Sequence, residues 1–177
     1  MSVQEKLLSI LSNNWEYEIN LKRNEYLVTK STINTNLFWV EKGSLRVFIE
    51  DENEEHTIRF GYKGSIIAAL DSFITNKPTN FYIQALKKCT IKVISKAKYL
   101  DIIESSVDNK KIWDQILQGL IYQQMEREID LITYSPQKRF ERVLERSPQV
   151  FQEIPQKYIA SYLRMTPETL SRILKKP

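Results

Sequence analysis

The sequence has little of the chemistry that enzymes and metal sites need. Its 177 residues include one cysteine, Cys89, and one histidine, His56. A single cysteine excludes an intrachain disulfide and a cysteine-ligated iron–sulfur cluster, and these two residues cannot assemble the usual nitrogen and sulfur ligand sets of a metal site. No Ser/His/Asp set or glycine-rich phosphate loop stands out. The composition therefore predicts a protein that is not an enzyme and holds no metal.

Long linkers and membrane segments are also missing. The chain has four glycines and six prolines, too few for long flexible linkers, and 42% of its residues are hydrophobic. No apolar run approaches the roughly 18 residues that span a bilayer. The first six residues lack the basic and apolar regions of a signal peptide. With one cysteine, this composition predicts a cytoplasmic protein without a membrane partner.

Positive charge is concentrated at one end of the chain. Residues 135–177 carry nine Lys/Arg against four Glu, a net +5, whereas the whole chain carries +4 and the remainder therefore −1. A basic module on a near-neutral body favours a polyanionic partner, with an affinity that falls as salt rises.

The C-terminal segment, residues 154–174, has the pattern of two short helices joined by a tight turn. Thr166 is the expected N-cap of the second helix, with Pro167 at its first position and Glu168 at the positive end of its dipole. The residues expected to pack the two helices together are Ile159, Tyr162, Leu163, Met165, Leu170, Ile173 and Leu174. Those expected to face outward are Thr169, Ser171, Arg172, Lys175 and Lys176. This layout predicts a DNA-binding helix-turn-helix.

From about residue 16 to 95 the pattern is one of short β-branched and aromatic runs separated by turn residues. The expected strands include 26–28, 37–40, 45–49, 56–60, 81–85 and 90–94. Several strands at this spacing predict a small sandwich or barrel. Residues 2–13 and 96–106 have the spacing of flanking helices.

One long helix is expected over residues 108–134. Its apolar stripe consists of Trp113, Ile116, Leu117, Leu120, Ile121, Met125, Ile129 and Ile132. We interpret it as a dimerisation helix; the alternative is that the stripe packs on the β domain. Ser135 and Pro136 provide an N-cap and a first helical position for the next helix, so the hinge and domain boundary are expected at residues 133–136.

A barrel, a long helix, a hinge and a helix-turn-helix in this order resemble the Crp/Fnr superfamily of bacterial transcription regulators. The most specific motifs are residues 40–48, 73–85 and 154–175. The resemblance implies an α+β fold. It consists of a cyclic-nucleotide-binding-like β-barrel (a jelly roll) at residues 1–107, a dimerisation helix at 108–134, and a winged-helix-like helix-turn-helix at 135–177 with little or no final wing. The implied dimer interface comprises Trp113, Ile116, Leu117, Leu120, Ile121 and Met125.

The resemblance also implies which residues contact DNA. The base-reading positions of the family correspond to Pro167, Glu168 and Arg172, where Glu168 could accept from cytosine and Arg172 could donate to guanine. Thr166, Thr169, Ser171 and Lys175 are better placed for phosphates. The implied partners are double-stranded DNA carrying an inverted repeat, a second copy of the chain and, as a candidate, RNA polymerase. Arg164 stands where the family often has a glycine. An arginine with positive φ costs roughly 1 kcal/mol, so a slightly adjusted turn is expected rather than a failed one.

The same resemblance implies a sensor that has lost cyclic AMP. Ala69 stands at the position of the ribose-binding glutamate, and Thr79, followed by Asn80, at that of the phosphate-binding arginine. A degenerate effector pocket would consist of Ala68, Ala69, Thr79, Asn80 and Gln124. Without the bidentate arginine a buried phosphate loses its strongest hydrogen bonds, so no cyclic AMP is expected and any other effector is unknown.

Several alternatives stay open. Lys77 could replace the missing arginine or be a solvated loop residue. Ile66, Ile67, Ala68, Ala69, Phe73 and Phe81 could line an apolar pocket or simply fill the barrel. His56 is expected to be an exposed strand residue and Cys89 a buried apolar one. The alternative function is a ligand-binding or protein-interaction module whose helix-turn-helix no longer binds DNA.

Overall fold

The computed structural model describes residues 2–175. Within this range the chain forms helices α1 (Val3–Leu11), α2 (Leu70–Thr75), α3 (Lys96–Glu104), α4 (Val107–Ile132), α5 (Pro136–Arg146), α6 (Gln149–Glu153), α7 (Gln156–Tyr162) and α8 (Pro167–Leu174). The strands are β1 (Tyr17–Leu21), β2 (Tyr26–Val28), β3 (Leu37–Lys42), β4 (Ser44–Asp51), β5 (Glu54–Tyr62), β6 (Ile66–Ile67), β7 (Tyr82–Ala85) and β8 (Cys89–Ile94).

The strands form two four-stranded antiparallel sheets, in the orders β1-β8-β3-β6 and β2-β7-β4-β5. The side chains between the sheets make one apolar cluster, which includes Val40, Leu45, Ile83 and Ile91, all fully buried. This arrangement confirms the α+β fold with a jelly-roll-like barrel. Cys89 lies in this cluster, as the sequence predicted.

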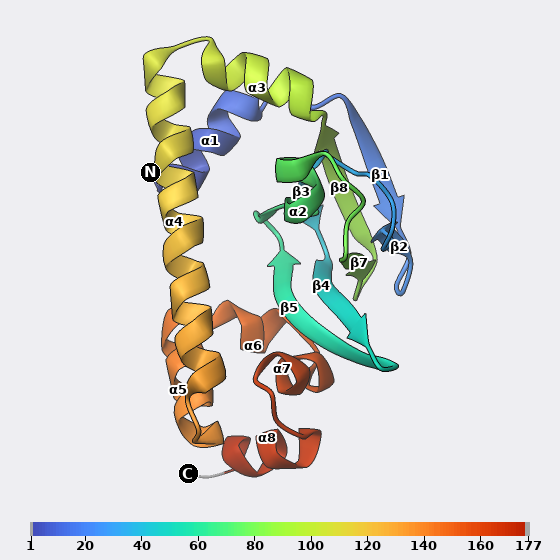
Figure 1. The fold of residues 1–177 in the computed structure, drawn as a ribbon, viewed down its shortest axis with the longest axis vertical. Coiled ribbons are helices and arrows are strands. Elements are labelled where there is room, and N and C mark those ends of the chain that lie inside the picture. Colours follow the sequence, from blue (N-terminus) through green and yellow to red (C-terminus); the bar gives the residue numbers. More distant parts are fainter. Residues whose placement is uncertain (1, 176–177) are drawn as a thin grey trace.

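The β4–β5 hairpin extends beyond the rest of the barrel (Figure 1). Glu52 and Asn53 at its tip both have positive φ, of 47° and 67°, which suits a tight two-residue hairpin turn. Along β4 the side chains alternate, so Leu45 and Val47 enter the core while Arg46 and Phe48 lie on the other face of the sheet. That face is covered by the C-terminal helices, as described below.

Some elements were not expected from the sequence. β1 and the two-residue β6 were not among the predicted strands, and α2 and α6 were not predicted as helices. β6 is a strand because it pairs with Phe38 and Trp39 of β3, a partner distant in the sequence. α2 and α6 span six and five residues, too short for a helical period to stand out.

A second cluster joins α1, α3 and the first half of α4 at one end of the molecule (Figure 1). Trp113 of α4 packs edge-on against Tyr99 of α3, with ring centroids 5.2 Å apart. Ile116 is also partly buried here. Trp113 and Ile116, at the start of the apolar stripe on α4, therefore pack within the same chain. For this part of the stripe the structure favours the alternative to a dimer interface.

Helix α4 runs the length of the molecule, and α5 folds back beside its second half (Figure 1). Thr133 is the C-cap of α4, and the Ser135 side chain caps α5 by accepting from the Lys138 N–H, with Pro136 at the first position. The predicted helix break and cap are confirmed. Over residues 2–175, no helix is both long and apolar enough to cross a membrane.

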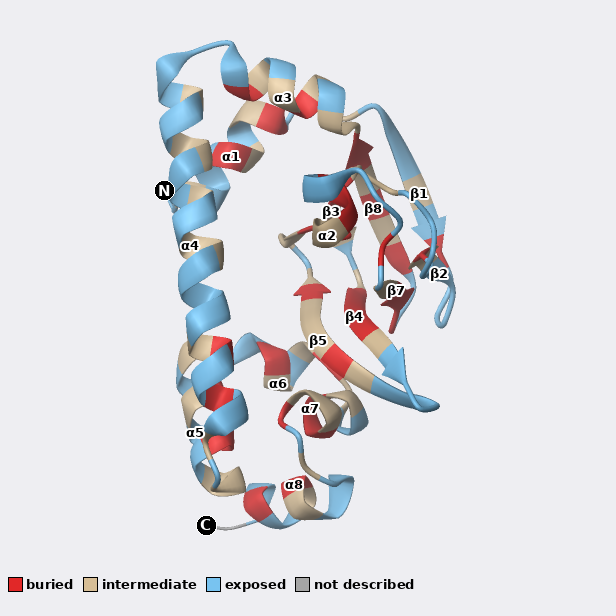
Figure 2. Cartoon of the chain, viewed as in Figure 1, coloured by how far each residue is buried: buried red, intermediate tan, exposed pale blue. Residues whose placement is uncertain are grey.

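The third cluster unites the C-terminal helices with the barrel. Its buried members from α5 to α8 include Val143, Ile159, Leu163 and Leu170, and Leu86, after β7, joins them from the barrel. Phe60 and Tyr62 of β5 pack against the same cluster. Figure 2 shows the buried faces of α5 to α8 turned toward one another and toward β5.

Candidate nucleic-acid interface

The turn between α7 and α8 is built without glycine. Arg164 takes the left-handed conformation at the turn, with φ of 53°. The Met165 N–H donates to the Ala160 carbonyl at 3.0 Å, and the Arg164 N–H to the Ser161 carbonyl at 3.1 Å. These two bonds are the Schellman pattern, which stops a helix and redirects the chain. The segment is therefore a helix-turn-helix in its local geometry.

The N-terminus of α8 is capped as the sequence predicted. The Thr166 hydroxyl accepts from the Thr169 N–H at 3.2 Å, and Pro167 occupies the first helical position. Hydrogen bonds from its own backbone and from Thr166 lower the pKa of Glu168, so this carboxylate is ionised at neutral pH. A negative side chain at this end also complements the helix dipole.

The outer face of α8 is open to solvent. Thr166, Pro167, Glu168, Arg172 and Lys175 are exposed. Thr169 and Ser171 are half-buried, and the Thr169 hydroxyl lies 3.1 Å from that of Thr166 within the cap. Five of the seven predicted DNA-contacting residues are thus fully presented, while these two lie farther in than expected. Lys176 lies outside the described residues.

The apolar side of the helix-turn-helix is formed largely as predicted. Ile159, Leu163, Leu170 and Ile173 are buried in the third cluster, and Tyr162 and Met165 pack partly against it. Leu174 was expected there too, but it is 41% exposed. It immediately follows Ile173, which fills the buried position, and successive helical residues point about 100° apart.

Much of the positive charge near this interface is turned inward. Arg139 is 9% exposed, and Arg142 and Arg146 are half-buried. Up to residue 175, where the described part of the chain ends, the exposed basic residues of the C-terminal segment are Lys138, Lys157, Arg164, Arg172 and Lys175. The net +5 of this segment therefore overstates the charge available to a polyanion, because three of its arginines serve the fold.

Two acids of α4 and two arginines of α5 join these helices. Arg142 Nε lies 2.9 Å from Asp130 Oδ1 and its Nη2 lies 2.9 Å from Glu126 Oε2, while Arg146 contacts both carboxylates. The Asp130 side chain is fully buried. Burial works against the charge on Arg146, but the hydrogen bond and charge of Asp130 outweigh it and raise the pKa of Arg146.

This network was not predicted from the sequence, although the sequence carries a signal for it. Both pairs, Glu126 with Asp130 and Arg142 with Arg146, are spaced by four residues. Such spacing places each pair on one face of its helix. Two faces of opposite charge on consecutive helices joined by a short turn indicate that the helices fold against each other.

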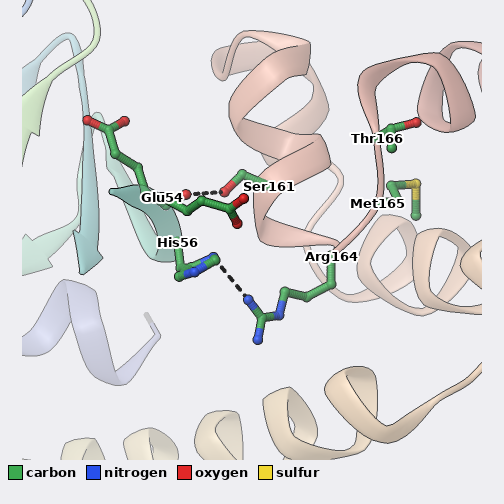
Figure 3. Close-up of a pocket in the computed structure, with 7 residues that line it drawn as sticks. Glu54, His56, Ser161, Arg164, Met165 and Thr166 are labelled. Atoms are coloured by element: carbon green, nitrogen blue, oxygen red, sulfur yellow. Dashed lines mark hydrogen bonds between the residues drawn. The ribbon is translucent and has the colours of Figure 1, made fainter. Parts of the chain in front are cut away.

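The helix-turn-helix also contacts the β4–β5 hairpin (Figure 3). The Ser161 hydroxyl of α7 accepts from the Thr57 N–H at 3.1 Å and donates to the Glu55 carbonyl at 3.3 Å. β5 is an edge strand, so its outward backbone groups have no neighbouring strand to pair with, and α7 supplies partners for two of them. This contact links segments 104 residues apart in the chain.

His56 differs from its prediction. It lies in β5 as expected, but it is half-buried and its Nδ1 is 3.1 Å from Nη1 of Arg164. The two side chains belong to a pocket of ≈ 480 Å³ that is also lined by Glu54, Ser161 and Thr166 (Figure 3). The barrel and the start of α8 therefore face each other across this pocket.

The predicted effector positions do not form one open site. Ala69 belongs to the barrel core and Ala68 packs beside α1 and α3, whereas Asn80 and Gln124 are exposed. Thr79 is 1% exposed. Ile66, Ile67, Phe73 and Phe81 likewise belong to the two apolar clusters, which favours the interpretation that they fill the barrel.

The carboxylate of Asp71 takes the hydrogen bonds at this place. It accepts from the Thr79 hydroxyl at 2.6 Å, the Asn80 N–H at 2.8 Å and the Ser72 N–H at 2.8 Å. Thr79, at the position expected for the phosphate-binding arginine, and Asn80 after it thus donate to a carboxylate of the same chain. Asp71 was not predicted as a site residue, because nothing in the neighbouring sequence marks it as the acceptor for residues eight and nine positions later.

The remaining stripe on α4 is exposed. Leu117, Ile121 and Met125 are 36%, 63% and 55% exposed, and Ile129 and Ile132 continue the same face. Leu120, also expected in the interface, is half-buried. The apolar stripe therefore divides into an end that packs on the barrel side of the same chain and an exposed remainder.

Known proteins match this architecture. The cyclic nucleotide-binding domain model matches residues 18–106, just over half of the chain. The chain therefore belongs to the cyclic nucleotide-binding domain family. Over 95% and 89% of its length, its fold is similar to those of two solved structures, of CooA and FixK2. No curated protein sequence gives a significant match.

Solved structures agree with this fold at low sequence identity. A CooA double mutant from Carboxydothermus hydrogenoformans has a TM-score of 0.72 at 21% identity, over 95% of this chain and 82% of that one. FixK2 from Bradyrhizobium japonicum has a TM-score of 0.72 at 15% identity, over 89% and 82%. The catabolite activator protein of Thermus thermophilus has a TM-score of 0.57 at 16% identity, over 97% and 80%.

Proposed function

We propose that this protein is a sequence-specific, DNA-binding transcription regulator that acts as a homodimer. The observation that carries the proposal is the geometry of α8. Its N-terminus is capped by Thr166, its inner face is buried through Leu170 and Ile173, and its outer face presents Glu168 and Arg172. A helix held in this way can enter the major groove and bring side chains to base edges.

The exposed stripe on α4 supports the homodimer. Leu117, Ile121, Met125, Ile129 and Ile132 follow one another at steps of four, four, four and three residues, so they lie along one face of the helix. An apolar face of this length in contact with water favours association. A second copy of α4 offers the same face, and a two-fold axis between the copies gives a self-complementary contact.

Asp71 supports a sensor that does not bind cyclic AMP. Its carboxylate already accepts from the Thr79 hydroxyl and the Asn80 N–H, and a phosphate in the same place would meet its negative charge. Like charges at hydrogen-bonding distance repel by several kcal/mol away from bulk water. Ala69 and Thr79 also stand where the Crp/Fnr superfamily, which the chain resembles, has a glutamate for the ribose and an arginine for the phosphate.

A different effector is compatible with this fold. The similar structures include CLP of Xanthomonas campestris, described as c-di-GMP responsive, and CprK in complex with OCPA. An effector of this protein would act by binding one orientation of the C-terminal helices better than another. RNA polymerase is the partner that a regulator bound near a promoter would contact.

The test is a selection from a randomised double-stranded DNA library with the purified full chain at about physiological salt. We expect enrichment of an inverted repeat whose half-sites lie about one helical turn apart. We also expect binding that weakens steeply as salt rises. If the protein neither binds DNA from the library nor is retained on heparin, the proposal is contradicted. A ligand-binding or protein-interaction module is then the favoured function.

A further inference from the structure

The guanidinium of Arg139 lies between the end of α4 and the end of α7. Its Nη1 donates to the Thr133 carbonyl at 2.7 Å and to the Tyr134 carbonyl at 2.9 Å. Its Nε donates to the Leu163 carbonyl at 2.8 Å, and its Nη2 to the Arg164 carbonyl at 3.0 Å. One buried side chain thus makes four hydrogen bonds, two to the break after α4 and two to the turn of the helix-turn-helix.

The four carbonyls that Arg139 bonds lie at the C-terminal ends of α4 and α7, where backbone carbonyls lack a partner within the helix. The last carbonyls of a helix have no N–H further along to bond. Thr133 and Leu163 are the C-caps of α4 and α7, and Tyr134 and Arg164 follow them. The C-terminal end of a helix also carries partial negative charge, which a guanidinium complements.

A second arginine contacts the same helix end. Nη2 of Arg127, on α4, donates to the Tyr162 carbonyl at 2.6 Å, and its guanidinium lies 3.8 Å from the centre of the Tyr162 ring. Three successive carbonyls, of residues 162, 163 and 164, therefore accept hydrogen bonds from arginines of α4 and α5. Burial lowers the pKa of Arg127, but such a shift leaves an arginine charged at neutral pH.

We propose that Arg139 is a positioning residue that fixes the orientation of α8 relative to α4 and thereby sets the spacing of the two DNA half-sites. This inference rests on the proposed function. In a dimer, the two α4 helices would define the two-fold axis, and each α8 would be placed from that axis through the break at residues 133–135. Arg139, on α5, bonds the break at Thr133 and Tyr134 and also the turn that leads into α8.

Only arginine has the shape for this role. Its planar fork presents donors in several fixed directions at once, whereas the lysine ammonium is a compact group whose three donors leave one atom. Lysine at this position could bond one side of the break or the turn, but not hold both in register. We therefore expect Arg139→Lys to behave like Arg139→Gln in spacing, although it keeps the charge.

The first experiment is a selection from a DNA library in which the enriched half-site is held constant and the spacer varies. The full chain is compared with Arg139→Gln, Arg139→Lys and the control Arg23→Gln, which removes a charge from an exposed barrel position. We expect wild type and the control to enrich one spacing. We expect both Arg139 variants to keep the half-site, accept neighbouring spacings and bind about tenfold more weakly, since only a fraction of conformers is then competent.

A second measurement does not depend on DNA. A spin label on Gln152→Cys, at an exposed position of α6, reports the distance between the two C-terminal segments of a dimer, while the buried Cys89 stays unlabelled. We expect a narrow distance distribution in wild type and a broader one in Arg139→Gln. Protection of the α7 and α8 amides from hydrogen exchange shows whether the helix-turn-helix is still folded.

The outcomes separate the inference from the proposed function. Wild-type spacing selection in Arg139→Gln, or an unchanged distance distribution, would overturn the positioning role. If Arg139→Gln loses both the half-site preference and the amide protection of α7 and α8, the positioning role is also overturned. Arg139 would then only keep the helix-turn-helix folded. If wild type itself selects no DNA, the proposed function fails, and the distance measurement still tests whether Arg139 fixes the orientation.

Discussion

Arg142 and Asp130 form an ion pair across the angle between α5 and α4, with Nε and Oδ1 2.9 Å apart and the aspartate side chain fully buried. Arg146 contacts the same carboxylate, so one buried acid holds two arginines of α5. This pair is one of the contacts that hold α5 against α4 where the chain reverses after the long helix.

Replacing Asp130 with asparagine should destabilise the protein strongly. The substitution removes the buried carboxylate and leaves Glu126 as the one acid that both arginines still contact. Loss of charge-assisted hydrogen bonds to a buried group costs about 1–3 kcal/mol. Denaturant unfolding at a fixed protein concentration measures the loss. Glu128→Gln, at an exposed position on the same helix, is the control and should change stability by less than about 0.5 kcal/mol. A loss below about 1 kcal/mol for Asp130→Asn would contradict the assigned role.

Replacing Asp71 with alanine should loosen the segment around Thr79. The buried Thr79 hydroxyl and the Asn80 N–H lose their acceptor, which costs about 1–3 kcal/mol. Thermal unfolding monitored by circular dichroism checks this, with the exposed Asp101→Ala as the control.

Titration calorimetry of wild type with cyclic AMP should give no binding heat. Saturable binding would disprove the view that Asp71 takes the place of the phosphate.

Arg172 and Lys175 should affect DNA binding in different ways. Arg172→Ala should weaken binding by about 1–3 kcal/mol and relax the preference at one base pair, as expected for a side chain that contacts a base. Lys175→Ala should weaken binding to all sequences alike and reduce the salt slope by about one, as expected for a phosphate contact. Both are measured by binding titrations against single-base variants at several salt concentrations. Equal behaviour of the two variants would refute the assignment.

Replacing Ile121 with glutamate should prevent dimerisation. The substitution places a charge in the middle of the exposed apolar face of α4, where burial against a second copy would cost several kcal/mol. Sedimentation equilibrium should show a dimer for wild type and a monomer for Ile121→Glu. Gln123→Glu adds the same charge two residues further along, on the opposite side of the helix, and should remain dimeric. A dimeric Ile121→Glu would exclude this face as the interface.

Replacing Ser161 with alanine should free the edge of β5. The Thr57 N–H and the Glu55 carbonyl lose their partner on α7, at a cost of about 1 kcal/mol. Hydrogen exchange at the Thr57 amide should become faster in the variant, while exchange in the barrel core at Ile83 should stay as in wild type. Equal Thr57 exchange rates in the two proteins would mean that α7 does not protect this edge.

The sequence by itself determined the elements whose signals are local. Thr166 with Pro167 marked the start of α8, and Ser135 with Pro136 marked the start of α5, because a helix cap depends on residues next to each other. The long helix could be predicted because its apolar period persists for several turns. It was predicted over 108–134, and α4 spans Val107–Ile132. The strand-rich region between residues 16 and 95 was recognised by its β-branched and aromatic runs.

Only the tertiary structure decided which polar side chains connect helices and strands that are distant in the sequence. Arg139 reaches carbonyls 24 and 25 residues away, Arg127 reaches one 35 residues away, and Ser161 pairs with backbone 104 residues away. None of these partners leaves a periodic pattern in the sequence, because unpaired helix-end carbonyls and sheet edges exist only once the chain has folded. The outward charge of the C-terminal segment was likewise settled by folding, since Arg139, Arg142 and Arg146 are turned inward and contact other parts of the chain instead of adding to the positive surface.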